Sequence, residues 1–77
     1  MAIYTIYRDV FTKDEKTGLW TKKTGREYLR LTKSGRYVWQ NDLQASSEFT
    51  LSESCKIIEN LQRVIRPNYG YGKVWQH

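Results

Sequence analysis

The chain has 77 residues and a mass of 9.2 kDa, which predicts one domain covering residues 1–77. Its apolar fraction of 39% and aromatic fraction of 14% favour a folded domain over a disordered one. No apolar run reaches the roughly 20 residues that cross a bilayer, and the first residues lack the apolar core of a signal peptide. We therefore expect a cytoplasmic protein with no membrane partner, located in the host cytoplasm if a phage encodes it.

Catalytic chemistry has little support in this sequence. Cys55 is the only cysteine and His77 the only histidine, which excludes an internal disulfide and a Cys/His zinc site. We expect Cys55 to be a small core residue on the buried face of a helix, because free cysteine is among the most buried residue types. The carboxylates are dispersed and the glycines lack a phosphate-loop spacing. The sequence thus predicts a protein that is not an enzyme, with no catalytic residues, metal or cofactor.

The first third of the chain is typical of β-strands. Residues 3–12 are rich in β-branched and aromatic side chains and carry no helical period. The polar run 13–18 predicts a hairpin loop in which Gly18 supplies a positive φ. Strand character resumes over residues 19–22, and residues 23–26 are interpreted as a second tight turn or a bulge.

A second hairpin is predicted around Ser34-Gly35, with strands over residues 27–33 and 36–41. If those two residues form the turn, the paired residues are Lys33–Arg36, Thr32–Tyr37, Leu31–Val38 and Arg30–Trp39. Alternation then places Leu29, Leu31 and Val38 on one face of the sheet. The opposite face would carry Tyr28, Arg30, Thr32, Tyr37 and Trp39.

The remainder predicts one helix and a final strand. Thr50 and Glu53 fit a capping box, which predicts a helix from Leu51 to about Ile65 before Pro67 stops it. Its expected apolar stripe is Leu51, Cys55, Ile58, Leu61 and Ile65, widened by Ile57 and Val64. A turn through residues 68–72 then leads to a strand over residues 73–76. The predicted fold is α+β, a curved antiparallel sheet of about four to five strands with one helix on one face, in the order β-β-β-(β)-α-β.

Positive charge is concentrated on the middle of the chain. The segment 22–36 holds six cations and one anion, Glu27, so its net charge of +5 equals that of the whole protein. Such a local charge attracts polyanions, although basic residues on exposed strands also serve solubility alone. The six cations are Lys22, Lys23, Arg26, Arg30, Lys33 and Arg36.

Aromatic residues are predicted beside these cations, because Tyr28, Tyr37 and Trp39 share a face with Arg30. Exposed rings next to guanidinium groups stack bases while cations hold phosphates. The same residue types also anchor protein interfaces. Plain packing between strands is the third explanation, and the sequence leaves these alternatives open.

The stretch from Glu27 onward resembles a pattern in very small phage and prophage proteins of the anti-defence, anti-CRISPR-like type. The residues that carry the resemblance are Tyr28, Leu29, Trp39, Leu43, Ala45, Phe49, Thr50, Leu51, Glu53, Ile57, Ile58, Leu61 and Val74. The resemblance implies a curved antiparallel sheet with one helix and an inhibitory role. It transfers no functional residue, because such inhibitors use different surfaces for different targets.

Our leading hypothesis is a small basic binding protein of phage accessory type that engages nucleic acid or a protein–nucleic-acid complex through a basic-aromatic hairpin. The expected binding residues are Lys22, Lys23, Arg26, Arg30, Lys33, Arg36, Tyr37 and Trp39. The alternative is a protein–protein inhibitor or adaptor that docks an acidic partner surface or a sheet edge without binding nucleic acid. Either a monomer or a dimer is compatible with the sequence.

Overall fold

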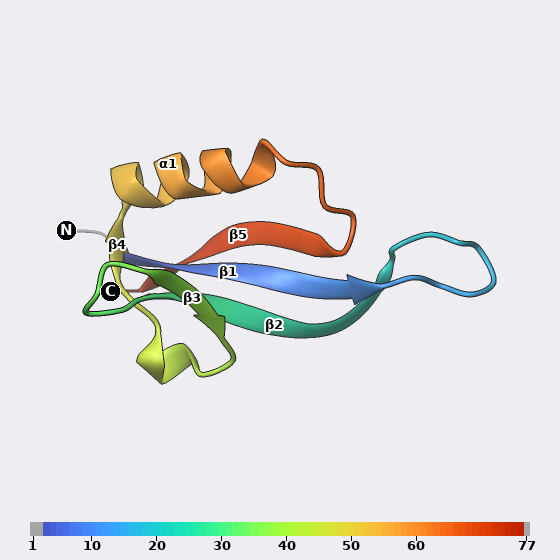
Figure 1. The fold of residues 1–77 in the computed structure, drawn as a ribbon, viewed down its shortest axis with the longest axis horizontal. Helices are drawn as coiled ribbons and strands as arrows, with labels where there is room; N and C mark the ends of the chain where they lie inside the picture. Colours follow the sequence, from blue (N-terminus) through green and yellow to red (C-terminus); the bar gives the residue numbers. More distant parts are fainter. Residues whose placement is uncertain (1–2, 77) are drawn as a thin grey trace.

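The computed structural model describes residues 3–76 and has the predicted α+β fold (Figure 1). Five strands form one antiparallel sheet, and a single α-helix lies along one face of it. The elements in chain order are β1 (Ile3–Thr12), β2 (Lys22–Leu31), β3 (Tyr37–Gln40), the short 3₁₀ helix η1 (Leu43–Ala45), β4 (Phe49–Thr50), α1 (Leu51–Gln62) and β5 (Tyr69–Gln76).

Strand β1 is the centre of the sheet. Along one side it pairs with β5 over residues 3–10, and along the other it pairs first with β4 and then with β2. Strand β3 pairs with the far side of β2, so that β3 and β5 form the two outer edges. All these pairings are antiparallel, which agrees with the short connections between the strands.

The β1–β2 hairpin confirms some of its sequence prediction and corrects the rest. Strand β1 has the predicted bounds, and Gly18 in the loop has a φ of 72°. Strand β2 begins only at Lys22, so the predicted strand over residues 19–21 is wrong. Val10 pairs with Gly25 and Phe11 with Lys23, which leaves Thr24 as the extra residue of a bulge. The segment 23–26 is therefore a bulge inside a strand and not a tight turn.

The register of the β2–β3 hairpin differs by one residue from the prediction. The observed pairs are Leu31–Tyr37, Arg30–Val38, Leu29–Trp39 and Tyr28–Gln40. The Thr32 amide donates to the Arg36 carbonyl at 2.8 Å, so three residues, 33–35, form the loop. A two-residue turn of the favoured type needs a positive φ at both central residues, whereas among residues 3–76 only Gly18 and Gly35 have one. Ser34 therefore does not support the predicted turn.

In this register, each side chain of β3 lies on the sheet face opposite to the predicted one. Tyr37 and Trp39 lie on the same face as Leu29, and Trp39 packs against the core together with Ile57 and Ile58 of α1. Val38 joins Arg30 on the opposite face. The predicted face combining Arg30 with Tyr37 and Trp39 is therefore not formed.

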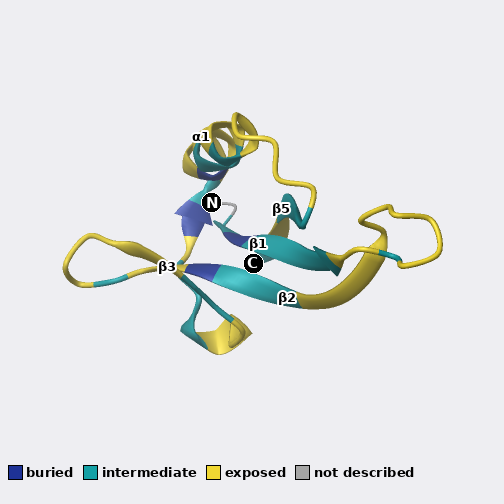
Figure 2. Ribbon diagram, turned by 45° about the vertical axis from the view of Figure 1, so that its right-hand side comes forward, coloured by how far each residue is buried: buried dark blue, intermediate teal, exposed yellow. Residues whose placement is uncertain are grey.

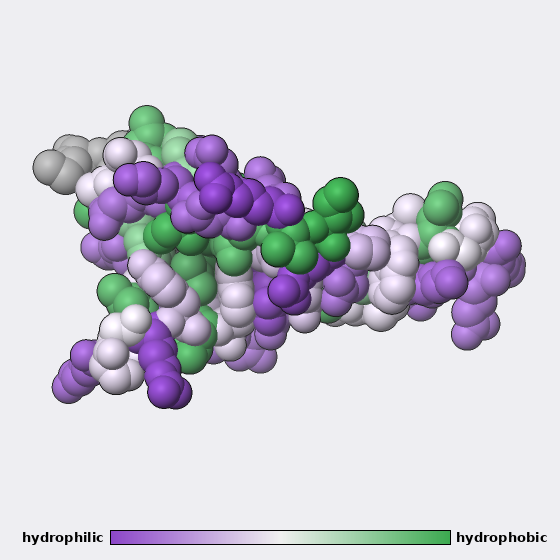
Figure 3. Space-filling view, turned by 45° about the horizontal axis from the view of Figure 1, so that its top comes forward, coloured by the Kyte–Doolittle hydropathy of each residue, from purple (hydrophilic) through white to green (hydrophobic). Residues whose placement is uncertain are grey.

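The core is small. Ile6, Leu29 and Phe49 are the buried hydrophobic residues of the described chain (Figure 2). In contrast, eleven large hydrophobic side chains between residues 3 and 76 are classed as exposed, and Figure 3 shows hydrophobic surface at several separate places. A domain of this size has little apolar burial to offset its chain entropy.

Helix α1 begins as predicted but is shorter and turned differently. The Thr50 hydroxyl accepts from the Glu53 amide at 3.2 Å, and the Glu53 carboxylate accepts from the Thr50 amide at 3.1 Å, which confirms the capping box. The helix ends at Gln62, three residues before the predicted end near Ile65. Its inward face is formed by Ser54, Ile57, Ile58 and Leu61.

The expected burial of Cys55 and Ile65 is wrong. Cys55 is exposed, and the Lys73 ammonium donates to its sulfur at 3.3 Å. Ile65 lies beyond the helix and its side chain is 92% exposed. The spacing of apolar residues predicted a buried face of α1 that includes Cys55. The observed buried face is shifted by about one residue, because it is centred on Ser54, a small residue that is fully buried.

Strand β5 is longer than predicted. Gly70 and Gly72 belong to the strand and not to a turn, because aromatic rings of β1 cover them. A Cβ at Gly70 would stand 3.1 Å from the Phe11 ring. Glycine in a strand commonly marks such a close approach.

Candidate nucleic-acid interface

The eight predicted binding residues do not form one surface. Four cations lie along β2, Lys33 lies in the β2–β3 loop, Arg36 follows that loop, and Tyr37 and Trp39 lie on β3. A strand advances about 3.3 Å per residue, which places Lys22 and Lys33 roughly 35 Å apart. The longest dimension of the molecule is 44 Å, so the residues divide between its two ends (Figure 2).

Two of the three predicted cations at the β1–β2 end are engaged by Asp9, whereas Lys22 is exposed and forms no ion pair within residues 3–76. Arg26 Nε lies 2.7 Å and Lys23 Nζ 3.3 Å from Asp9 Oδ1. The Arg26 guanidinium also lies 3.9 Å from the centroid of the Tyr7 ring. These contacts fix Lys23 and Arg26 within the fold and reduce the net charge that this end presents to a ligand.

The pKa values of Asp9 and Arg26 reflect this pairing. Partial burial would raise the pKa of Asp9, but the hydrogen bonds and charges of Arg26 and Lys23 outweigh it and hold the pKa below its ordinary value. The hydrogen bond to Asp9 raises the pKa of Arg26. Both groups therefore remain charged at neutral pH.

The other end of the molecule keeps its cations available. Arg30, Lys33 and Arg36 are exposed, and no ion pair within residues 3–76 involves them. The sequence has no carboxylate between Glu27 and Asp42 that would neutralise them. Tyr37 belongs to the same hairpin but lies on the opposite face of the sheet from Arg30; the residue is 54% exposed and its ring lies 6.5 Å from that of Phe49. We call Arg30, Lys33, Arg36 and Tyr37 the turn site.

Trp39 is engaged inside the fold. Its ring centroid lies 6.0 Å from that of Tyr71, and the Arg8 guanidinium lies 4.5 Å above it. Because Trp39 also packs against the buried core, its position corresponds to packing between strands, one of the three roles that the sequence left open.

Sequence reasoning overlooked Arg8. Its guanidinium lies between Trp39 and the ring of Tyr69, 4.2 Å away, and its Nε donates to Glu27 at 2.7 Å. The side chain is only 17% exposed. The available signal was its position in β1, where strand alternation puts Arg8 on the same face as Ile6. A hollow of about 230 Å³ beside it is lined by Arg8, Trp39, Leu61, Val64, Arg66 and Tyr71.

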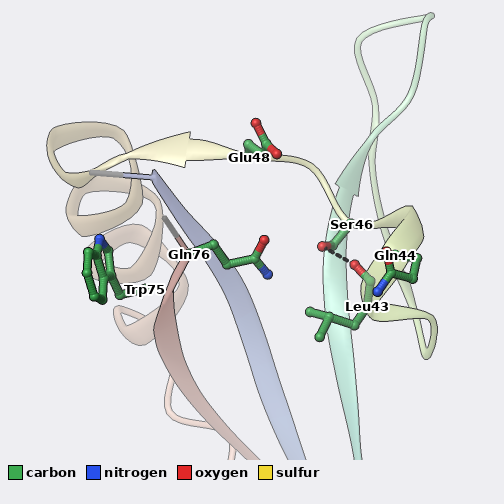
Figure 4. Close-up of a pocket in the computed structure, with 6 residues that line it drawn as sticks. All are labelled: Leu43, Gln44, Ser46, Glu48, Trp75 and Gln76. Carbon is green, nitrogen blue, oxygen red and sulfur yellow. Dashed lines mark hydrogen bonds between the residues drawn. The ribbon is translucent and has the colours of Figure 1, made fainter. Parts of the chain in front are cut away.

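A second hollow of about 390 Å³ lies between the η1 segment and the end of β5 (Figure 4). Its lining residues are Leu43, Gln44, Ser46, Glu48, Trp75 and Gln76. Glu48 is the one carboxylate in this lining, and the Ser46 hydroxyl donates to the Leu43 carbonyl at 2.6 Å. A serine bound in this way, without a basic partner in the lining, has no means of activation as a nucleophile.

The described residues also bear on metal binding and on membrane insertion. Residues 3–76 contain no cluster of three or more His, Cys, Asp or Glu side chains arranged to hold a metal ion. His77 lies outside the described residues. Within those residues, no helix has the length and apolar character needed to cross a membrane.

Comparison with known proteins finds no matching family model, no matching curated protein and no matching solved structure.

Proposed function

We propose that the protein is a non-enzymatic binding protein that engages nucleic acid, alone or within a protein–nucleic-acid complex, through the turn site. The observation that supports this proposal is the presence of three exposed cations without an ion-pair partner in residues 3–76 at the β2–β3 hairpin, together with the exposed Tyr37 on the other face of the same hairpin. Such a combination suits phosphates and bases together. We propose a host nucleic acid, or a complex that contains one, as the target class, and the resemblance to small phage anti-defence proteins adds the expectation of an inhibitory role.

The turn site favours a single strand over a duplex. Lys33 and Arg36 flank the tip of the hairpin and would contact consecutive phosphates. Tyr37 would stack on an unpaired base, because the contact of its ring with Phe49 supports it from the protein side. The site reads no base edges, so we expect weak sequence preference and strong salt dependence.

A titration with a labelled single-stranded oligonucleotide tests this function. The double variant Lys33→Glu/Arg36→Glu should abolish binding. Its matched control is Lys13→Glu/Lys16→Glu, which makes the same change in net charge in the loop at the far end of the molecule. The control should retain most of the affinity. For the wild type, the logarithm of affinity should fall linearly with the logarithm of salt, with a slope of about −0.7 per phosphate contact.

Two results contradict the proposal. Equal losses from the two double variants would show that overall charge, and not the turn site, drives binding. If the wild-type protein does not bind the oligonucleotide even at low salt, the proposed nucleic-acid function is wrong.

In the second case, the turn site is better interpreted as a surface for an acidic protein. Val38 pairs with Arg30 on one face of the hairpin and Leu31 pairs with Tyr37 on the other, and these two apolar residues are 39% and 44% exposed. Arginine and tyrosine next to apolar residues are typical of protein interfaces. The same charge-reversal variants would then be compared for loss of an acidic protein partner.

A further inference from the structure

Strand β5 leaves one long edge of the sheet without a neighbouring strand. Of the strands in residues 3–76, only β1 pairs with it, along all eight residues of Tyr69–Gln76. Side chains on this edge are accessible, with Val74 38% and Trp75 62% exposed. Natural proteins usually cover or disfavour such an edge, because its backbone groups pair readily with another strand.

The ladder with β1 fixes which backbone groups point outward. The Phe11 amide donates to the Asn68 carbonyl at 2.8 Å, which extends the β1–β5 register by one residue pair. Hydrogen-bonded and non-hydrogen-bonded pairs alternate in an antiparallel ladder, so the odd-numbered residues of β5 direct their N–H and C=O groups away from β1. Within the described chain, no hydrogen bond reaches those groups of Tyr71 and Lys73.

The edge also lacks the features that prevent strand pairing. Strand β5 contains no proline, and its ladder with β1 runs without a register shift. Lys73 is its one charged residue, and the Lys73 ammonium is directed to Cys55 at 3.3 Å and toward the ring of Tyr4. The edge is therefore regular and open to another strand.

A second copy of the chain fits this edge through a twofold axis perpendicular to the sheet. Directly opposed residues in an antiparallel pair point to the same face, and the axis keeps both helices on one face. Residues opposed across the axis must therefore be both even or both odd. Every register centred on a residue, and not midway between two residues, meets this condition, and we compare those centred on residues 71, 72 and 73 near the middle of β5.

The register centred on Gly72 is the best of the three. It sets Tyr71 opposite Lys73 of the second copy on each side of the axis, which joins the outward N–H and C=O groups of both residues and places a cation beside a ring. The Tyr69 amide already donates to the Arg66 carbonyl at 3.1 Å, so the hydrogen-bonded pairs of this register are those of Tyr71 and Lys73. A register centred on residue 73 would oppose two Lys73 ammonium groups, and one centred on residue 71 would leave residues 74–76 without a partner.

We propose that two copies of the protein form a symmetric dimer by antiparallel pairing of their β5 strands, in the register that sets Tyr71 opposite Lys73 of the second copy. Pairing across the axis joins the two five-stranded sheets and covers the β5 edge of each copy, while the β3 edges stay unpaired. This dimer does not depend on the proposed nucleic-acid function, because the turn site lies on the β2–β3 hairpin at the other edge of the sheet.

Sedimentation of the wild-type protein from about 1 μM to about 1 mM tests the dimer directly. We expect a rise toward twice the chain mass of 9.2 kDa as concentration increases. A single monomeric species over that range would overturn the proposal. Amide exchange adds a measurement that needs no variant. The Tyr71 and Lys73 amides should exchange more slowly at high concentration, whereas exchange at Trp39, whose amide points outward from the β3 edge, should stay constant.

A charge pair tests the register. Tyr71→Lys would oppose two cations at each of two equivalent places and should weaken the dimer by roughly tenfold or more. Tyr71→Glu removes the same ring contacts with Trp39 and Tyr69 but opposes Lys73, so it should preserve the dimer. Tyr71→Lys/Lys73→Glu should restore pairing. Circular dichroism and thermal melts establish that each variant is folded. Equal dimerisation of the Tyr71→Lys and Tyr71→Glu variants would overturn the register.

Discussion

The phenol ring of Tyr7 occupies the space in which a side chain at residue 72 would stand. A Cβ added to Gly72 would overlap the Tyr7 ring, with its Cε2 atom only 2.9 Å away. The Arg26 guanidinium also packs against this ring, with its Cζ atom 3.9 Å from the ring centroid. Gly72, Tyr7 and Arg26 therefore form a layered contact across β5, β1 and β2, on the sheet face opposite α1.

This relationship predicts that Gly72→Ala destabilises the protein. Forcing a methyl group against a packed ring should lower the free energy of unfolding by about 1–3 kcal/mol, measured by urea denaturation. Gly25→Ala is the matched control, because no atom lies within 4 Å of the Cβ position and the φ of Gly25 is not positive. It should cost little.

A double-mutant cycle with Tyr7→Leu shows whether the ring is the cause. The loss from Gly72→Ala should be smaller when the ring is absent, so that the two substitutions are not additive. Additive losses would contradict the proposed contact.

The parts of the fold that the sequence predicts correctly are those specified by local signals. The composition of residues 3–12 defines β1, and Thr50 with Glu53 defines the start of α1. The extent of β5 was missed because its two glycines are covered by rings from β1, a tertiary contact with no signal in residues 68–72.

The predicted face that combines cations with aromatic rings forms only in the predicted register of the β2–β3 hairpin, and that register depends on the position of Gly35. Two loop lengths were compatible with the hydrophobic pattern, and shifting between them moves Tyr37 and Trp39 to the other face. Gly35 distinguishes the two loop lengths. It supplies a positive φ at the last position of a three-residue loop, whereas the two-residue turn would also need a positive φ at Ser34, which Ser34 does not have. Neutralisation of Lys23 and Arg26 was not predictable from composition, because Asp9 reaches them only through the pairing of β1 with β2.

The ion pairs of Asp9 predict a pH-dependent contribution to stability. The pKa of Asp9 is lower in the folded than in the unfolded chain, so its stabilisation is present above the unfolded pKa of about 4 and disappears as the pH falls through the folded pKa. Asp9→Asn should therefore reduce the free energy of unfolding by about 1 kcal/mol at pH 7, with the difference shrinking in acid. Urea denaturation at neutral and acidic pH measures it.

Glu48→Gln is the control for this change, since Glu48 is exposed and forms no ion pair within residues 3–76. It should have little effect at either pH. A loss from Asp9→Asn that is constant with pH would argue against stabilisation by charge.

The orientation of α1 predicts different outcomes for neighbouring apolar positions. Ile58 packs against the core, so Ile58→Ala should cost about 2 kcal/mol or more, a large share of the roughly 5 kcal/mol expected for so small a domain. Cys55→Ala should change stability by less than about 0.5 kcal/mol, because Cys55 is exposed. Thermal and urea denaturation of both variants checks this. If Cys55→Ala were the more damaging change, the helix would be turned toward the stripe that the sequence alone predicts.

The two aromatic residues of β3 should separate stability from binding. Trp39 packs on the core and against Tyr71, so Trp39→Ala should lower the free energy of unfolding by about 3 kcal/mol and reduce oligonucleotide binding only through the loss of folded protein. Tyr37 is 54% exposed, so Tyr37→Ala should cost little stability. If Tyr37 stacks on a base, its loss should weaken binding by about 1–3 kcal/mol.

The salt dependence distinguishes stacking from a phosphate contact. Because a tyrosine neutralises no phosphate, Tyr37→Ala should leave the slope of log affinity against log salt unchanged, whereas Lys33→Ala should reduce its magnitude by about 0.7. Titrations of both variants at several salt concentrations, run beside thermal melts, measure these changes. A folded Trp39→Ala protein that loses affinity at unchanged stability would transfer the stacking role from Tyr37 to Trp39. That result would require the ring of Trp39 to leave its contacts with Arg8 and Tyr71 when the ligand binds.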